Sequence, residues 1–206
     1  MRRIKITKEN LDSLLKIASK KIKEGKVIVC PTDTVYGLIA HAGNERAVRR
    51  IFKIKKRPKE KPIAIFVGDI EMAKKFAKIG KNQEKFLKKY WPGALTAILY
   101  SKNNLCRGIY GKNKTVGIRV PDYKLITDLI DKVAFPLAQS SANISGILTP
   151  LKLKEIIEQF RNRKEKPDLI LDKGDLPQRL PSTVINLTRK KPKILREGKL
   201  KVNYLI

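Results

Sequence analysis

The chain has 206 residues, of which 42% are hydrophobic and 32% charged, and this composition fits a folded globular protein and excludes a disordered chain. Lysine and arginine number 47 against 19 acidic residues, which gives a formal net charge of +28 and favours an anionic partner. The sequence has no apolar run of the roughly 20 residues that span a membrane, and its charged start lacks the apolar stretch of a signal peptide. We therefore expect a cytoplasmic protein that makes no membrane contact.

The chain alternates between helical and strand-like segments. Residues 7–23 predict an amphipathic helix with Thr7 as its N-cap and Gly25 as its stop, and residues 27–30 predict a strand that ends at Pro31. Asn44 is expected to cap a helix that Pro58 terminates. The remaining elements are expected as strands at 63–67, 95–100, 115–120, 134–139, 169–171, 183–187 and 193–195, and as helices from the cap Asp69 through 79, before 91–93, at 123–133 and at 151–160.

This pattern predicts a single α/β domain over residues 1–206, with a twisted mixed β-sheet flanked by helices. Cys30 and Cys106 have neither metal-site nor disulfide-framework spacing, so we interpret both as packed thiols. His41 is the only histidine. We interpret it as a loop residue after a strand rather than as a catalytic residue. The sequence therefore predicts no protein-built metal site.

The standard phosphate-binding loops are absent, because residues 108–114 (GIYGKNK) do not match GxxxxGK[ST] and read best as a hairpin loop. Polar segments follow several apolar runs, where α/β sheets gather ligand sites. Each segment also has a structural reading, as a hydroxyl-bonded turn, a helix cap or a solvated basic loop. The four segments are PTDTVYGL at 31–38, KIKKRPKEKPIAI at 53–65, VGIRVP at 116–121 and SSANISG at 140–146.

Together, in this order and spacing, these segments resemble the YrdC-like threonylcarbamoyl-AMP synthase family, and the resemblance extends from about residue 11 to residue 198. A Lys-x-Arg element at Lys55 and Arg57 is paired with a Ser-x-Asn element at Ser141 and Asn143. Further agreement lies in IRVP, in STV at 182–184 and in the closing LREG. The chain is similar to the short form of the family, without an additional C-terminal domain.

The resemblance implies that L-threonine, bicarbonate and ATP are condensed to threonylcarbamoyl-AMP and pyrophosphate, for t6A modification of tRNA by a downstream threonylcarbamoyl transferase. Such a reaction needs no protein nucleophile, because alignment and charge neutralisation lower its barrier. Mg²⁺ would be carried by the phosphates and water, since carboxylates are not clustered. Asp33 is the acidic residue within the segment PTDTVYGL.

Site residues also follow from the resemblance. Arg119 would hold either the threonine carboxylate or the forming carbamate, because its planar fork fits both. Two departures from the family pattern concern Leu151, where a small-residue segment is usual, and Phe66, where many members have histidine. The implied catalytic residues are Lys55, Arg57, Ser141 and Asn143; the implied ATP contacts are Lys55, Lys59, Thr115, Ser141, Asn143 and Arg196; and the implied threonine contacts are Thr32, Arg119 and Ser182.

The alternative function is a basic module that binds tRNA or double-stranded RNA without catalysis. Its support is the net charge, although lysine-rich composition is also typical of heat-adapted proteins. Against it, the chain shows no aromatic signature of a known RNA-binding module. An enzyme requires polar residues that converge in one cleft, whereas an RNA-binding module requires lysine and arginine spread along an open face.

Overall fold

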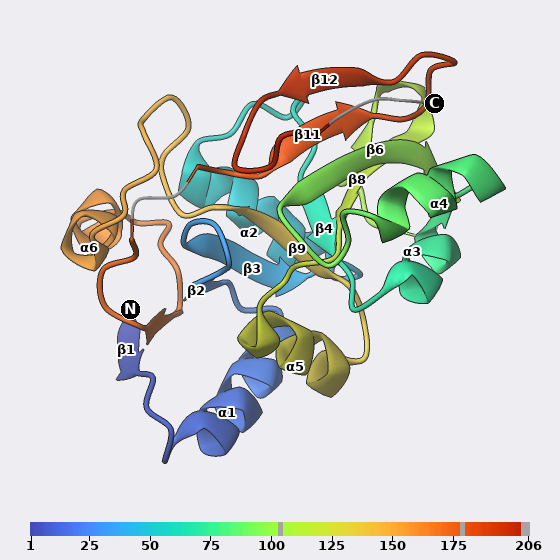
Figure 1. Cartoon of the computed structure of the whole chain (residues 1–206). Coiled ribbons are helices and arrows are strands. Elements are labelled where there is room, and N and C mark those ends of the chain that lie inside the picture. The colour runs from blue at the N-terminus through green and yellow to red at the C-terminus, as the bar shows by residue number, and fades with distance from the viewer. Residues whose placement is uncertain (103–104, 178–179, 203–206) are drawn as a thin grey trace.

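The computed structural model describes residues 1–102, 105–177 and 180–202. They form a single α/β domain around one large mixed sheet (Figure 1), which confirms the predicted fold class. Parallel pairs join β1, β10 and β2, and antiparallel pairs join β2, β3 and β9. Within the described residues no helix is long and apolar enough to cross a membrane. The strands are β1 (Arg2–Lys5), β2 (Ile28–Cys30), β3 (Gly37–His41), β4 (Ala64–Phe66), β5 (Ala77–Lys78), β6 (Leu95–Ser101), β7 (Tyr110–Gly111), β8 (Thr115–Arg119), β9 (Leu137–Ser141), β10 (Leu169–Asp172), β11 (Thr183–Asn186) and β12 (Lys193–Arg196).

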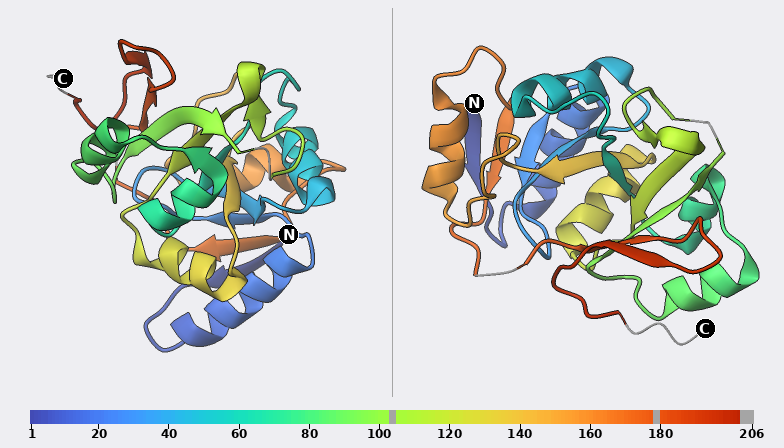
Figure 2. Two further views of the ribbon diagram at one scale, coloured as in Figure 1. Left: turned by 90° about the vertical axis from the view of Figure 1, so that its right-hand side faces the viewer. Right: turned by 90° about the horizontal axis from the view of Figure 1, so that it is seen from above.

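Helices cover the two faces of the sheet unequally. On one face a large apolar cluster joins the sheet to α2, α3, α4 and α6. On the other face a smaller cluster joins α1 and α5 to one end of the sheet, and Figure 2 shows these two helices side by side. No described helix packs on the rest of this second face. The helices are α1 (Leu11–Lys23), α2 (Glu45–Lys55), α3 (Ile70–Phe76), α4 (Lys81–Lys88), α5 (Lys124–Val133) and α6 (Leu153–Arg161), with a short 3₁₀ turn at Lys112–Lys114.

Two of the predicted helix caps are confirmed. The side chain of Asn44 accepts a hydrogen bond from the backbone N–H of Ala47 at 3.0 Å, and Asp69 accepts one from Met72 at 2.6 Å. These bonds satisfy backbone donors that a helix start leaves without partners. α2 ends at Lys55, before Pro58, as expected.

The predicted start of the first helix is wrong. α1 begins at Leu11 and not at Thr7. The backbone N–H of Thr7 donates to Asn10 Oδ1 at 3.0 Å, and that of Asn10 donates to Thr7 Oγ1 at 3.3 Å. These reciprocal bonds close a turn before the helix, so Thr7 caps the turn and not the helix.

The predicted end of the third helix is also wrong. α3 stops at Phe76 and not at Ile79, because Ala77 and Lys78 leave the helix to pair with β6. Pairing with a neighbouring strand here overrides local helix propensity.

Besides β5, described above, and the two-residue β7 within the expected hairpin loop, two strands of the sheet were not expected from the sequence. β1 is the edge strand with the charged sequence RRIK, and β3 begins inside the segment PTDTVYGL. β3 places His41 at its end, where the imidazole stacks on Phe135 with ring centroids 4.7 Å apart.

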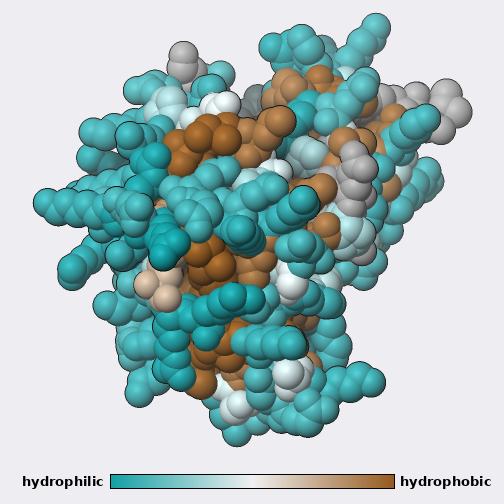
Figure 3. All heavy atoms as spheres, turned by 90° about the vertical axis from the view of Figure 1, so that its left-hand side faces the viewer, coloured by the Kyte–Doolittle hydropathy of each residue, from teal (hydrophilic) through white to brown (hydrophobic). Residues whose placement is uncertain are grey.

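The surface that carries β1 and α6 is mostly hydrophilic, with apolar side chains showing between the charged ones (Figure 3).

Candidate functional site

A pocket lies on the part of the sheet that α1 and α5 do not cover. Side chains alternate between the two faces of a strand, and the register places Gly37, Ala64 and Gly117 on the same face. A Cβ on Gly117 would lie 3.2 Å from the Ala64 Cβ and 3.2 Å from the Ile98 Cδ1. Because these residues are small, few side-chain atoms cover the sheet here, and a cavity of about 290 Å³ remains.

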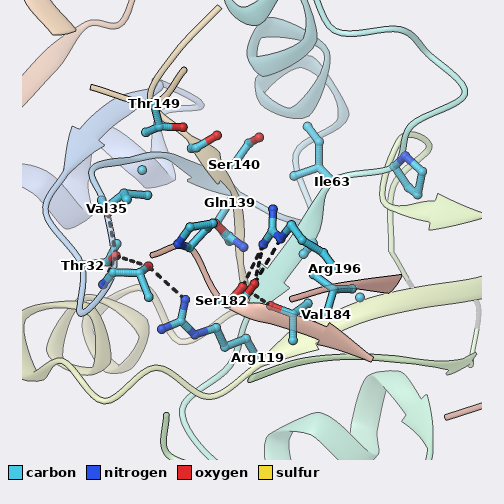
Figure 4. Close-up of a pocket in the computed structure, with 18 of the residues that line it drawn as sticks. Thr32, Val35, Ile63, Arg119, Gln139, Ser140, Thr149, Ser182, Val184 and Arg196 are labelled. Atoms are coloured by element: carbon cyan, nitrogen blue, oxygen red, sulfur yellow. Dashed lines mark hydrogen bonds between the residues drawn. The ribbon is translucent and has the colours of Figure 1, made fainter. Parts of the chain in front are cut away.

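Polar side chains from distant parts of the sequence surround this cavity (Figure 4). Six of the residues implied by the family resemblance line the pocket: Thr32, Arg57, Arg119, Ser141, Ser182 and Arg196. All four polar segments and the STV and LREG segments thus contribute, which satisfies the requirement for an enzyme stated above. The complete lining is Thr32, Thr34, Val35, Gly37, Arg57, Pro62, Ile63, Ala64, Thr96, Ile98, Gly117, Arg119, Gln139, Ser140, Ser141, Thr149, Pro181, Ser182, Val184 and Arg196.

Among the residues that the structure describes, the lining contains three arginines and no carboxylate. Burial lowers the pKa of the Arg57 guanidinium, and the positive charge of Arg196 lowers it further. Burial likewise lowers the pKa of Arg196. Two partly desolvated cations that destabilise each other gain most from a bound anion. The pocket is therefore suited to a ligand with several negative charges.

Protein contacts fix both of these arginines. Arg57 donates through Nε to the Lys61 carbonyl at 2.8 Å and through Nη2 to the Pro62 carbonyl at 2.9 Å. Arg196 donates through Nη2 to the Ser182 carbonyl at 2.8 Å and to the Ser182 Oγ at 3.1 Å. Each arginine still has N–H groups beyond these bonds to offer a ligand.

Arg119 lies at the base of the pocket and is 2% exposed. Its Nη2 forms an ion pair with Asp33 at 2.5 Å, its Nη1 donates to Thr34 Oγ1 at 3.2 Å, and its Nε donates to the Gly93 carbonyl at 2.9 Å. The guanidinium carbon also lies 5.6 Å from the centre of the Phe66 ring. Phe66, noted above as a departure from the family pattern, thus supports Arg119 by a cation–π contact.

The turn after β2 shows that the structural and functional readings of PTDT are compatible. Thr32 Oγ1 donates to the Val35 carbonyl at 2.6 Å and accepts the Thr34 N–H at 3.1 Å. These bonds shape the turn, as hydroxyl-bonded turns do. The same turn directs Thr32 and Thr34 to the pocket and Asp33 to Arg119.

Lys55 and Asn143 belong to the family signature but do not line the pocket. The Lys55 ammonium is buried, donates to the Asn143 carbonyl at 2.8 Å and to Asn143 Oδ1 at 2.9 Å, and also donates to the Ser141 carbonyl. Ser141 Oγ donates to Asn143 Oδ1 at 2.6 Å. Lys55 thus ties the end of α2 to the turn after β9 and positions Ser141, which does line the pocket.

Two further implied ATP contacts lie outside the pocket lining. Lys59 is exposed on the loop after α2, and Thr115 begins β8 two residues before Gly117. Their contact with ATP stays a prediction. Leu151 does not line the pocket either, although Thr149, two residues earlier, does.

Sequence reasoning missed several polar lining residues. Thr96 is buried, and its Oγ1 lies 2.9 Å from Ser182 Oγ. A threonine within the apolar run LTAIL was the available signal, because a buried hydroxyl requires a polar partner. Gln139 and Ser140 sit at the end of β9, just before the signature serine. Among the described residues no cluster of three histidine, cysteine or acidic side chains could hold a metal ion.

Comparison with known proteins finds related sequences along most of this chain. The family model Sua5_yciO_yrdC, described as "Telomere recombination", matches residues 20–198. Threonylcarbamoyl-AMP synthase of Pyrococcus abyssi is 39% identical over 90% of this chain, which spans 54% of that protein's length. A putative threonylcarbamoyl-AMP synthase of Methanocaldococcus jannaschii is 36% identical over 97% of this chain and 93% of its own. This chain therefore spans about half of the first relative and nearly all of the second.

Solved structures agree with the fold. The crystal structure of P. abyssi Sua5 complexed with L-threonine is 37% identical, has a TM-score of 0.86 and aligns with 96% of this chain and 57% of its own. The crystal structure of E. coli YciO is 28% identical, has a TM-score of 0.85 and aligns with 96% of this chain and 94% of its own. Relatives of similar length thus include both a putative synthase and proteins whose names state no activity.

Proposed function

The chain belongs to the Sua5/YciO/YrdC family, and we propose that it is an L-threonylcarbamoyladenylate synthase. The observation that carries the proposal is the convergence of Arg57, Arg119 and Arg196 on one pocket whose described lining holds no carboxylate. A triphosphate and an amino-acid carboxylate are the anions that this charge pattern suits. The printed names of the relatives above support the same choice.

The proposed reaction has two bond-forming steps. The threonine amine attacks bicarbonate to give a carbamate, with loss of water. A carbamate oxygen then attacks the α-phosphorus of ATP, and pyrophosphate leaves with its bond electrons. Mg²⁺ would accompany the phosphates. No protein side chain becomes covalently attached, so one non-catalytic histidine is sufficient for this chemistry.

The roles follow from where the arginines lie. Arg57 and Arg196 face each other closely enough to lower the pKa of Arg57, so we assign both to the phosphates, where they stabilise charge that develops in the transition state. Arg119 is fixed deeper, between Asp33 and Phe66. We assign it to the threonine carboxylate or the forming carbamate, with Thr32 and Ser182 beside it. The product would pass to a threonylcarbamoyl transferase that modifies tRNA.

The decisive experiment is pyrophosphate release by the purified protein. We expect release only when ATP, threonine and bicarbonate are all present. Serine should be a poorer substrate, by roughly ten- to two-hundredfold in kcat/KM, because it lacks one methyl group. Threonine-independent hydrolysis of ATP to ADP would contradict the proposal.

The alternative, a basic RNA-binding module without catalysis, rests on the net charge of +28. It explains neither the convergence of six motif residues on one pocket nor the buried contacts that hold Arg119. RNA binding without any threonine-dependent pyrophosphate release would favour it.

A further inference from the structure

A second hollow outside the pocket combines lysines with an exposed aromatic ring. It is lined by Lys78, Tyr100, Ser101, Lys102, Asn113 and Lys114 and measures about 580 Å³; we call it the Tyr100 groove. Tyr100 is 46% exposed, whereas most large apolar side chains are buried. An exposed ring in a hollow can receive a flat ligand, so its surroundings decide which ligand fits.

The sheet register sets the geometry of the groove. Tyr100 on β6 lies directly opposite Lys78 on β5 and Thr115 on β8. Directly opposed residues of antiparallel strands point to the same face, with Cβ atoms about 5 Å apart. The side chains of Tyr100 and Lys78 therefore leave the sheet on the same face. Because Thr96, Ile98 and Tyr100 alternate along β6, the groove lies on the pocket side of the sheet.

The other wall of the groove is a turn with unusual backbone. Asn113 and Lys114 are consecutive non-glycine residues with φ of 59° and 56°. This left-handed conformation is costly for residues with side chains and is often retained at ligand sites. Here it holds Lys114 at the groove, and of the described side chains three lysines and no acidic residue line it.

We propose that the Tyr100 groove binds single-stranded nucleic acid, with a base stacked on Tyr100 and the neighbouring phosphates held by Lys78, Lys102 and Lys114. Aromatic rings interleaved with cations are the combination that such ligands require. An acidic peptide would use the lysines but not the ring, and an intact duplex keeps its bases stacked inside. This binding goes beyond the proposed synthase reaction and does not depend on it.

The test is fluorescence anisotropy with a labelled 12-nucleotide single-stranded RNA at low salt. Tyr100→Ala should weaken binding about tenfold, while Tyr100→Phe, which keeps the ring, should stay within about twofold of wild type. The triple variant Lys78→Gln, Lys102→Gln, Lys114→Gln should lower the slope of log affinity against log salt by roughly 2.

A charge-matched control separates the groove from general attraction. Lys8→Gln, Lys20→Gln, Lys164→Gln removes the same charge from exposed positions elsewhere and should weaken binding less than the groove triple does. Equal losses in both triples, or unchanged binding in Tyr100→Ala, would overturn the proposal. So would an RNA duplex of 12 base pairs that binds as tightly as the single strand. Pyrophosphate release measured without RNA should remain at the wild-type rate in every groove variant, so failure of the proposed reaction is detected separately.

Discussion

The guanidinium of Arg119 is held on three sides, by Asp33, Thr34 and the Gly93 carbonyl. Three of its five N–H donors are thus used, and two remain for a substrate. Such fixing reduces the reorganisation needed when a carboxylate arrives. The segment IRVP indicated from the sequence that an arginine mattered, but the partners come from the β2 turn and the segment before β6, whose proximity only the fold reveals.

Arg119→Lys should chiefly raise the threonine requirement, because lysine keeps the charge and loses the planar fork. We expect KM for threonine to rise by roughly ten- to a hundredfold, the value of one or two charged hydrogen bonds, while ATP binding measured without threonine stays near wild type. Arg57→Ala should instead reduce ATP binding and turnover. Calorimetric ATP titration and initial rates across threonine concentrations measure both effects. Equal loss of ATP binding in the two variants, with unchanged threonine dependence, would refute this division of roles.

Lys55 is a signature residue whose ammonium is buried against Ser141 and Asn143, and its predicted contact with ATP stays a prediction. Burial, assisted by the charge of Arg57, lowers its pKa to about 7, whereas a lysine in the unfolded chain titrates near 10.4. Between these values the unfolded chain binds one more proton than the folded chain. The free energy of unfolding contributed by this group therefore rises with pH across that window, by at most about 1.4 kcal/mol per pH unit.

The free energy of unfolding of the wild type minus that of Lys55→Met should accordingly increase from pH 7 to pH 10. Urea unfolding at several pH values measures it. Lys20→Met, at an exposed position on α1, provides the control and should show no such trend. A wild-type advantage that is constant with pH would show that the ammonium is not destabilised by burial.

At the scale of elements, the sequence predicted most helices and strands because apolar periodicity and caps are local signals. It failed where pairing across the sheet decided the outcome. β1 is charged and exposed, so the sequence RRIK alone does not predict a strand. It is a strand because it pairs with β10. Ala77 and Lys78 are good helix formers that β6 recruits as an edge strand. The same limitation applies to the site, since the motifs indicated its members but not that Lys55 would be buried behind Ser141.

Small residues on one face of the sheet also explain where the pocket lies. Three neighbouring positions carry no side chain or only a methyl group, namely Gly37, Ala64 and Gly117. A larger side chain at any of them would therefore occupy the cavity. Gly117→Val should lower kcat/KM by on the order of tenfold to a hundredfold, because displaced substrates lose alignment. Gly68→Ala is the matched control, since its Cβ would meet Ile130 at an ordinary 3.7 Å. Steady-state kinetics with thermal unfolding distinguishes a filled pocket from a destabilised fold, and undiminished activity of Gly117→Val would contradict this description of the pocket.

At the scale of the whole molecule, the excess of 28 positive charges is the dominant feature. Surface ion pairs such as Lys16 with Asp12 and Arg49 with Glu45 neutralise some of the 47 cationic side chains, but exposed pairs contribute little individually, and the excess remains even if every acidic residue is paired. Like charges that remain repel one another in the compact state. The three arginines of the pocket share this excess, which raises the local concentration of anionic substrates.

The melting temperature should therefore rise as sodium chloride increases from about 10 to about 150 mM, over which the screening length falls from roughly 30 to 8 Å. Screening weakens the repulsion among many separated lysines more than it weakens the few close pairs, so the net effect is stabilising. Inorganic triphosphate at the same ionic strength should raise the melting temperature further, because it binds Arg57 and Arg196 in the folded state. Differential scanning calorimetry measures both, and Arg57→Ala should lose most of the triphosphate effect while keeping the salt effect. A melting temperature that falls with salt would mean that the ion pairs outweigh the repulsion, and a triphosphate effect undiminished in Arg57→Ala would place the anion outside the pocket.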